Sequence, residues 1–255
     1  MASTPEHVEV NRAHWTRSNA EFTDADAEDK WAREEIVWGS FEWPESELRI
    51  FGDVAGLDVV ELGCGTAYFS AWLARRGARP VGIDVTPAQL DTARRMQARH
   101  GLDFQLVEAS AEDVPLPDAS FDLALSEFGA SIWCDPERWI PEAARLLRPG
   151  GRLVFARGST IEQLCFGEER VTERLEHDWS ELERMDFRSE GGGIEFHPPV
   201  GVTLGVLRRA GFELLALHEL LAPPEAETHP HYDFVTADWA RRWPSVEIWD
   251  ARKQA

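Results

Sequence analysis

Apolar and polar positions follow two alternating periods between residues 57 and 157. Short apolar runs, typical of buried strands, are separated by stretches in which apolar residues recur with the 3.6-residue period of a helix. Because strands that alternate with helices are joined by crossovers, this pattern predicts a mostly parallel α/β sheet with helices on both faces. The expected strands span residues 59–62, 80–83, 103–108, 121–125 and 152–156.

The pattern changes before this core, which we assign to residues 51–157. Residues 1–50 are polar, and we interpret them as an N-terminal helical cap. They contain the tryptophans Trp15, Trp31, Trp38 and Trp43. These side chains either pack on the edge of the core or cover a bound ligand and its substrate.

The pattern also changes after the core. Residues 158–200 are rich in charge and are predicted to be a largely helical insertion that forms a lid, with a flexible run of three glycines at 191–193. Residues 201–255 are expected to return to the core sheet. They should supply a helix at 201–210, a strand at 212–220, a short helix and a final edge strand at 246–249.

Charge and cysteine content exclude several classes of partner. The chain has 255 residues and a formal net charge of −20, whereas nucleic acids and anionic membranes attract basic surfaces, so we expect neither as a partner. Its three cysteines form no C-x-x-C pair, which predicts no metal site and free thiols in a reducing cytoplasm. No signal sequence or run of 18 apolar residues is present, so no membrane-spanning helix is expected. The oligomeric state stays open.

The most informative stretch is a strand, a glycine turn, a helix, a second strand and an acid. The first strand carries Glu61 near its end, the turn contains Gly63 and Gly65, and Asp84 follows the second strand. Glycines let the backbone turn sharply and let a ligand approach closely, while Asp84 can accept hydrogen bonds from both hydroxyls of a ribose. The arrangement predicts a site for an adenosine-containing cofactor at the carboxyl ends of the strands.

Two side chains separate the candidate cofactors. A dinucleotide fingerprint would place its third glycine where this chain has Tyr68, which is too bulky for close contact between helix and strand. Glu61 would repel a pyrophosphate, but it suits a cofactor that carries an ammonium and a sulfonium group. S-adenosylmethionine is therefore favoured over a dinucleotide, and an oxidoreductase is disfavoured.

Four motifs in order resemble the class I S-adenosylmethionine-dependent methyltransferases of the small-molecule type. They are the glycine turn at 61–66, Asp84, the loop and strand start at 109–122 and the turn into a strand at 147–155. The resemblance implies a Rossmann-like, mostly parallel seven-stranded sheet whose last strand is antiparallel. Ala67 replaces the third glycine of the family motif and Ser110 replaces a frequent Asp, so a side-chain contact to the adenine amino group would have to come from another residue.

The resemblance and the strand ends together give the candidate cofactor-binding residues. Val85 is expected to pack on the adenine, Ala111 and Glu112 to read its edge from a loop, and Ser126 to lie beside the methionine end. For the glycines the alternative is an ordinary tight turn, and for Glu112 it is a solvated loop acid. The full set is Glu61, Gly63, Cys64, Gly65, Asp84, Val85, Ala111, Glu112 and Ser126.

Candidates for acceptor binding follow the fourth strand, because ligands of open α/β sheets bind beyond the strands' carboxyl ends. Phe128 and Trp133 are expected to line an acceptor pocket, although Trp133 suits core packing equally well. Glu127 is a candidate base or a binding group for a substrate amine, or alternatively a helix-start acid or a member of a surface ion pair. The candidate histidine bases in the flanking segments are His14, His197, His229 and His231, of which His197 is preferred although a lone histidine is more often structural.

The sequence therefore predicts a cytoplasmic enzyme that transfers a methyl group from S-adenosylmethionine to a small molecule. The acceptor atom (O, N, S or C) is left open, as is the need for a base. The alternative is a catalytically idle S-adenosylmethionine-binding protein with a regulatory or scaffold role, which would bind the cofactor without converting it.

Overall fold

A seven-stranded sheet organises the chain in the computed structural model, which describes residues 4–230 and 232–254. Five strands are mutually parallel, and the last strand is antiparallel to both of its neighbours, as predicted. In spatial order the strands are β10 (Phe212–Leu220), β11 (Val246–Lys253), β7 (Leu147–Gly158), β6 (Phe121–Glu127), β3 (Asp58–Leu62), β4 (Arg79–Asp84) and β5 (Gln105–Glu108).

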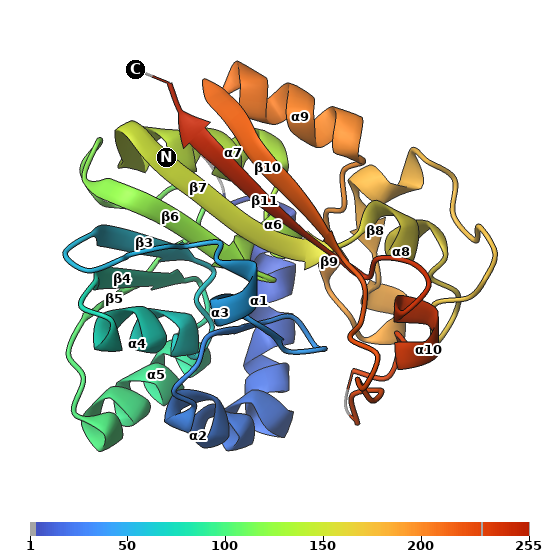
Figure 1. Cartoon of the computed structure of the whole chain (residues 1–255), viewed down its shortest axis with the longest axis horizontal. Coiled ribbons are helices and arrows are strands. Elements are labelled where there is room, and N and C mark those ends of the chain that lie inside the picture. The colour runs from blue at the N-terminus through green and yellow to red at the C-terminus, as the bar shows by residue number, and fades with distance from the viewer. Residues whose placement is uncertain (1–3, 231, 255) are drawn as a thin grey trace.

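Both faces of the sheet are covered because successive side chains of the buried strands point to opposite sides. Val59 joins the apolar cluster beside α4, whereas Val60 joins the cluster beside α7 and α9. Figure 1 shows these helices on either side of the strands. The helices that cover the sheet are α4 (Tyr68–Arg75), α5 (Pro87–His100), α7 (Pro136–Leu146) and α9 (Val200–Arg209).

The prediction that the final strand is an edge strand is wrong. Strand β11 lies between β10 and β7, and β10 forms the edge. The successive residues Ile248 and Trp249 are both fully buried. Strand β11 therefore carries buried apolar side chains on both of its faces, as an inner strand does. In β10, by contrast, exposed residues such as Glu213 and Glu219 leave much of the strand open to solvent.

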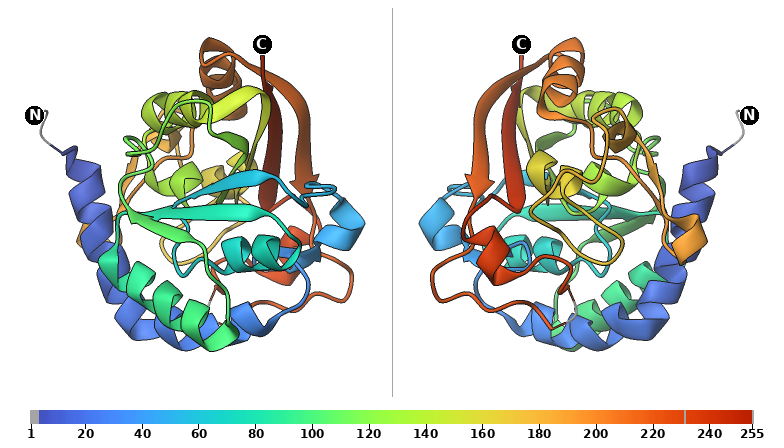
Figure 2. Two further views of the ribbon diagram at one scale, coloured as in Figure 1. Left: turned by 90° about the vertical axis from the view of Figure 1, so that its left-hand side faces the viewer. Right: turned by 90° about the vertical axis from the view of Figure 1, so that its right-hand side faces the viewer.

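The N-terminal segment is a nearly continuous helix followed by a small ribbon that packs against the sheet. Figure 1 shows the first helices where the arrowheads of the parallel strands lie, and Figure 2 shows them curving along one side of the molecule. The elements are α1 (Glu6–Ser18), the π-helix η1 (Asn19–Thr23), α2 (Asp24–Ala32), β1 (Val37–Trp38), β2 (Trp43–Pro44) and α3 (Glu45–Leu48).

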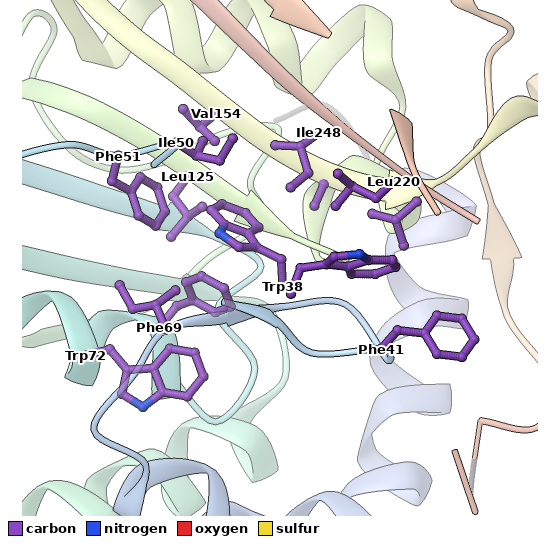
Figure 3. Close-up of a cluster of buried hydrophobic side chains, with 14 of the residues drawn as sticks. Trp38, Phe41, Ile50, Phe51, Phe69, Trp72, Leu125, Val154, Leu220 and Ile248 are labelled. Carbon is purple, nitrogen blue, oxygen red and sulfur yellow. The ribbon is translucent and has the colours of Figure 1, made fainter. Parts of the chain in front are cut away.

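The four N-terminal tryptophans divide between the two predicted roles. Trp31 and Trp38 are fully buried and Trp43 nearly so, which makes them core residues. Figure 3 shows Trp38 packed among Phe51, Phe69 and side chains of the sheet. Trp15 alone lines the cavities described below.

Residues 159–199 are not largely helical, which corrects the prediction for this segment. Their acidic stretches offer no continuous apolar stripe, and Leu175 and Trp179 remain 69% and 57% exposed, so nothing favours a long packed helix. Short elements are connected by loops. They are α8 (Thr160–Leu164), the 3-10 turns η2 (Glu181–Glu183) and η3 (Arg188–Glu190), and the paired strands β8 (Met185–Asp186) and β9 (Ile194–Glu195).

The remaining short helices flank the carboxyl ends of the strands. Helix α6 (Ala130–Trp133) follows β6, and α10 (Ala237–Ala240) lies in the loop between β10 and β11. Figure 1 shows α8 and α10 on the same side of the molecule, beyond the end of β7. Loops from distant parts of the chain therefore converge on one end of the sheet.

Candidate functional site

A first cavity of about 180 Å³ opens at the carboxyl ends of β3, β4 and β6. It is lined by seven of the nine residues that the sequence predicted to bind a cofactor. They are Glu61, Gly63, Cys64, Gly65, Asp84, Val85 and Ala111.

The turn after β3 is held against the end of β4 by backbone and side-chain bonds. The amides of Gly63 and Cys64 both donate to Ile83 O at 2.9 Å, and Gly65 N donates to Asp84 Oδ2 at 2.8 Å. Gly65 has φ +54°, and a Cβ on it would meet only Gln89 Oε1, at 3.9 Å. Its open side is therefore available to a ligand in the first cavity.

Gly63 serves a different purpose from Gly65. A Cβ on Gly63 would lie 2.6 Å from Ala130 N, and a Cβ on Gly129 would lie 2.2 Å from Gly63 O. The two glycines thus let the turn after β3 and the loop after β6 meet backbone to backbone. Gly129 lines the first cavity but was not among the predicted site residues. In the sequence, only its position after the fourth strand indicates that Gly129 could belong to the site.

Three acids near the first cavity have raised pKa values. Burial raises the pKa of Glu61 to about 8, although Ser70 N and Ser70 Oγ donate to its Oε2. Burial also raises the pKa of Asp84, against the opposing effect of amide donors from Thr86 and Gly65. Burial likewise raises the pKa of Glu127. A positively charged ligand would relieve this cost by favouring the ionised carboxylates.

These features fit S-adenosylmethionine. Asp84 has carboxylate oxygens at the end of β4, where a ribose would bind, and Glu61 offers negative charge for an ammonium or a sulfonium. The open side of Gly65 gives the cofactor close access to the backbone. Tyr68, the bulky residue that disfavours a dinucleotide, is the first residue of α4. Ala67 precedes it in a left-handed conformation with φ +61°.

Glu112 and Ser126 do not line the first cavity. Glu112 Oε1 contacts His7 Nε2 at 2.5 Å and accepts from Asp135 N at 2.8 Å, and Oε2 lies 2.7 Å from Arg138 Nε. This carboxylate joins α1 to the loop before α7. Ser126 Oγ donates to Leu62 O at 2.9 Å and accepts from Ser131 N, so its hydroxyl ties two strand ends together.

A second cavity of about 670 Å³ adjoins the first. Its walls come from the N-terminal segment, the ends of β6 and β7, residues 162–197 and the loop before β11. Seven residues line both cavities, so the two spaces meet along a common wall that we call the junction. The junction residues are Trp15, Lys30, Tyr68, Glu127, Phe128, Trp133 and Tyr232.

Glu127 and Tyr68 form a hydrogen-bonded pair at the junction. Tyr68 Oη donates to Glu127 Oε2 at 2.8 Å, and Gly39 N donates to Oε1 at 3.3 Å. Burial and the neighbouring Glu127 raise the pKa of Tyr68 well above its ordinary value. Lys30 opposes the rise in the pKa of Glu127 and lies 4.8 Å from the centre of the Tyr68 ring. Glu127 is therefore an acid of raised pKa within reach of both cavities.

Phe128 and Trp133, the predicted acceptor residues, are both junction residues. Phe128 has φ +50°, a left-handed conformation that is costly for an aromatic residue. Its carbonyl accepts from Trp133 Nε1 at 3.1 Å, and His14 stacks on the Trp133 ring. The loop after β6 thus presents an aromatic surface to both cavities.

His197 lies at the second cavity but not at the first. It is 3% exposed, and its Nε2 lies 2.7 Å from Glu195 Oε2. Among the other histidine candidates, burial lowers the pKa of His14, and His229 lines the second cavity. His231 lies outside the described residues.

Asn11 of α1 was missed by sequence reasoning because its partners are distant in the chain. Its side chain donates to Trp133 O at 2.9 Å and to Ile194 O at 2.8 Å, and accepts from Ile194 N at 2.8 Å. Asn11 is 3% exposed. A Cβ on Gly193 would lie 2.5 Å from Asn11 Oδ1, so this glycine permits close packing between α1 and the 159–199 segment.

The sequence predicts neither a metal site nor a membrane-spanning helix. Within residues 4–230 and 232–254, no group of three or more His, Cys, Asp and Glu side chains is arranged to hold a metal ion. Over the same residues, no helix is both long and apolar enough to cross a membrane.

Comparisons with known proteins match the strands that build the first cavity. Residues 60–155 match the family model of a methyltransferase domain. The chain is 29% identical over 207 residues to a demethylmenaquinone methyltransferase of Tropheryma whipplei (strain Twist), a match that covers 72% of this chain and 82% of that protein. It is 38% identical over 102 residues to a malonyl-[acyl-carrier protein] O-methyltransferase of Serratia marcescens, over 40% of this chain and 38% of that protein.

A solved structure extends the similarity to most of the fold. An S-adenosylmethionine dependent methyltransferase from Mesorhizobium loti superposes with a TM-score of 0.65 at 26% identity, covering 82% of this chain and 96% of that one. The family model, however, begins after the N-terminal helices and ends before residue 158. It therefore leaves out most of the wall of the second cavity.

Proposed function

Since this chain belongs to the class I S-adenosylmethionine-dependent methyltransferases, we propose that it methylates a small organic acceptor bound in the second cavity. The observation that carries the proposal is the junction, whose seven residues line both cavities. An acceptor in the second cavity would abut the cofactor without leaving the protein interior. The relatives support a small acceptor group, since their names refer to demethylmenaquinone and a malonyl group.

When bound, S-adenosylmethionine supplies a methyl group that the acceptor's lone pair can attack, while the electrons of the broken C–S bond stay on sulfur. The protein's part is to hold the two molecules in line, exclude water and remove a proton where the acceptor atom carries one. Asp84, Glu61 and the turn at Gly65 would hold the cofactor. We assign proton removal to Glu127, because burial raises its pKa and makes it a stronger base than an exposed carboxylate, and because it reaches both cavities.

Glu127→Gln tests this assignment with S-adenosylhomocysteine formation as the readout across a panel of small acceptors. Loss of a general base should lower kcat by about 10²–10⁴-fold and remove a pH-dependent limb, with little change in affinity for S-adenosylhomocysteine. Glu225→Gln changes an exposed acid outside both cavities and should have no effect.

Two outcomes would contradict parts of the proposal. Unchanged kcat in Glu127→Gln would remove Glu127 from the chemistry. Binding of S-adenosylhomocysteine without turnover of any acceptor would favour the idle cofactor-binding alternative.

We further propose that residues 10–45 and 158–200 act together as a lid over the acceptor. The bonds of Asn11 support this role because they connect α1 directly to β9 and α6. Ion pairs from Arg184 and Arg188 to Glu6 also join the start of α1 to the 158–200 segment at the surface. A lid formed in this way would exclude water from the junction when both molecules are bound.

A further inference from the structure

The second cavity contains a buried carboxylate that no cation neutralises. Glu162 is 5% exposed and lines this cavity. Its Oε1 accepts one hydrogen bond, from Gln163 Nε2 at 3.1 Å. Among residues 4–230 and 232–254, no Lys, Arg or His pairs with it. Burying a carboxylate without a counter-ion is costly, so the site is poised for one.

Helix capping does not account for Glu162. Ser159 is the N-cap of α8, and its Oγ accepts from Glu162 N at 3.1 Å, so Glu162 occupies the position from which a glutamate usually reaches back to the cap amide. Ser159 N instead donates to Ser245 O at 3.0 Å. The capping box is therefore open, and the carboxylate of Glu162 faces the cavity.

Glu162 lies near two other acids, each of which has a cationic or histidine partner, whereas Glu162 has none among the described residues. Burial raises its pKa well above the ordinary value, and the nearby Glu195 and Glu247 raise it further. Glu247 is paired with Arg157 at 2.6 Å, and Glu195 contacts His197 at 2.7 Å.

The lysine and the arginine that line the second cavity interact with other residues. Arg33 pairs with Glu42, and Lys30 lies over the ring of Tyr68 at the junction. Neither forms an ion pair with Glu162. Within the described part of the chain, no cationic side chain therefore forms an ion pair with this carboxylate.

Aromatic rings line the same cavity. The rings of Phe166 and Phe234 have centroids 5.9 Å apart, and those of Phe166 and Phe187 are 6.4 Å apart. Aromatic faces attract organic cations and also pack against apolar groups. A buried acid beside such rings is complementary to an ammonium or amidinium group on an apolar molecule.

We propose that Glu162 is the counter-ion for a cationic group of the acceptor, with Phe166, Phe187 and Phe234 packing around the apolar part. The proposal rests on the proposed function, because it takes the second cavity as the acceptor's site. Glu162 lines the second cavity but not the first, so it holds the cationic group away from the junction. That group is therefore a recognition handle and stays protonated, while a different atom of the acceptor receives the methyl group.

Three indole probes of different charge test this assignment in protein saturated with S-adenosylhomocysteine. Tryptamine is cationic at neutral pH, tryptophol is its neutral counterpart and indole-3-acetate is anionic. Calorimetric titration should show that tryptamine binds at least about tenfold more tightly than tryptophol, with indole-3-acetate weakest. In Glu162→Gln the advantage of tryptamine should fall to roughly twofold or less, while tryptophol affinity changes little. Glu169→Gln, an exposed acid of the same segment outside both cavities, should keep the full preference.

The inference is wrong if tryptamine binds no more tightly than tryptophol, and this includes the case in which neither probe binds. It is also wrong if Glu162→Gln keeps the preference for tryptamine over tryptophol. A preference for tryptophol would assign Glu162 to hydrogen bonding in its neutral form. Circular dichroism checks that the variant is folded, and if it is not, the ranking of the probes by the unaltered protein decides. Failure of S-adenosylhomocysteine to bind in the first titration would contradict the proposed function instead, so the two failures are distinguishable.

Discussion

The two cavities share a wall but are built in different ways. The first is formed by consecutive strand ends and turns between Glu61 and Ala111, completed by the loop after β6 and by α1. The second is formed by residues from Trp15 to Phe234. Most of them come from segments outside the regular alternation of strands and helices, and α4 and the end of β6 supply the others. The match to the methyltransferase family model, at 60–155, follows this division.

The difference follows from what each cavity has to recognise. A common cofactor can be bound by backbone turns and one or two acids that stay close in the sequence, as at Gly65 and Asp84. An acceptor needs side chains of specific shape and charge, which the fold gathers from loops. We therefore expect changes in the first cavity to act on cofactor binding and changes in the second to act on acceptor binding.

The largest expected effect comes from a substitution that should disturb the fold around both cavities at once. The turn after β3 and the loop after β6 touch at Gly63 and Gly129. Gly63→Ala should destabilise the protein by about 3 kcal/mol or more, since its methyl group would collide with the backbone of Gly129 and Ala130. Gly101→Ala is the matched control, with a similar positive φ and no atom within 4 Å of its Cβ, and should cost about 1–2 kcal/mol. Urea denaturation measures both. Equal losses in the two variants would mean that the backbone contact is unimportant.

The second prediction isolates the first cavity. Asp84→Ala should weaken S-adenosylhomocysteine binding by about tenfold to a hundredfold, because charge-assisted hydrogen bonds are worth roughly 1.5–3 kcal/mol. Affinity for an acceptor probe such as tryptamine should change much less, since Asp84 does not line the second cavity. An unchanged dissociation constant for S-adenosylhomocysteine would remove Asp84 from the site.

The same division explains what the sequence could predict. The strands from β3 to β7 and the glycine turn follow from local periodicity and spacing, and the structure confirms them. Periodicity did not reveal that Glu112 turns toward His7, 105 positions away, because that contact depends on how α1 packs. The place of β11 between β10 and β7 was likewise missed, since strand order is a property of the whole sheet.

The roles of individual side chains were harder to predict than the elements. Trp38 and Trp15 are the same residue type in the same polar segment, yet one is core and the other lines both cavities. Glu162 carried no signal beyond its place after Ser159. Only three-dimensional packing shows that, among the described residues, its carboxylate has a hydrogen bond from Gln163 but no cationic partner.

The third prediction sharpens the electrostatic account of the first cavity. Glu61 has a pKa of about 8 in the free protein, so below that pH it is mostly protonated and must release a proton when a cationic ligand binds beside it. Affinity for S-adenosylhomocysteine should therefore rise as pH increases from about 6 towards 8, by up to about tenfold per unit. In Glu61→Gln this component should be absent. The ligand's own amino group titrates in the same range but affects both proteins alike, so the difference between their slopes is the measurement. Parallel slopes would contradict the assignment.

The smallest expected effect concerns the contacts between α1 and the chain at Trp133 and Ile194. Asn11→Ala removes all three bonds between α1 and the chain at Trp133 and Ile194, leaving two carbonyls and one amide without their partner. Hydrogen exchange at 10–45 and 158–200 should become faster, and the added protection expected there when S-adenosylhomocysteine and an acceptor probe are both bound should shrink. Asn11 also lines the first cavity, but its side-chain amide is engaged with Trp133 and Ile194. Affinity for S-adenosylhomocysteine alone should therefore change by less than about threefold, because the hydrogen bond between Gly65 and Asp84 is untouched. Arg12→Ala is the matched control on the same helix, since its surface ion pair with Glu108 is worth at most about 1 kcal/mol. If the two segments exchange identically in the free and the doubly bound protein, they are a fixed wall and the lid proposal is wrong.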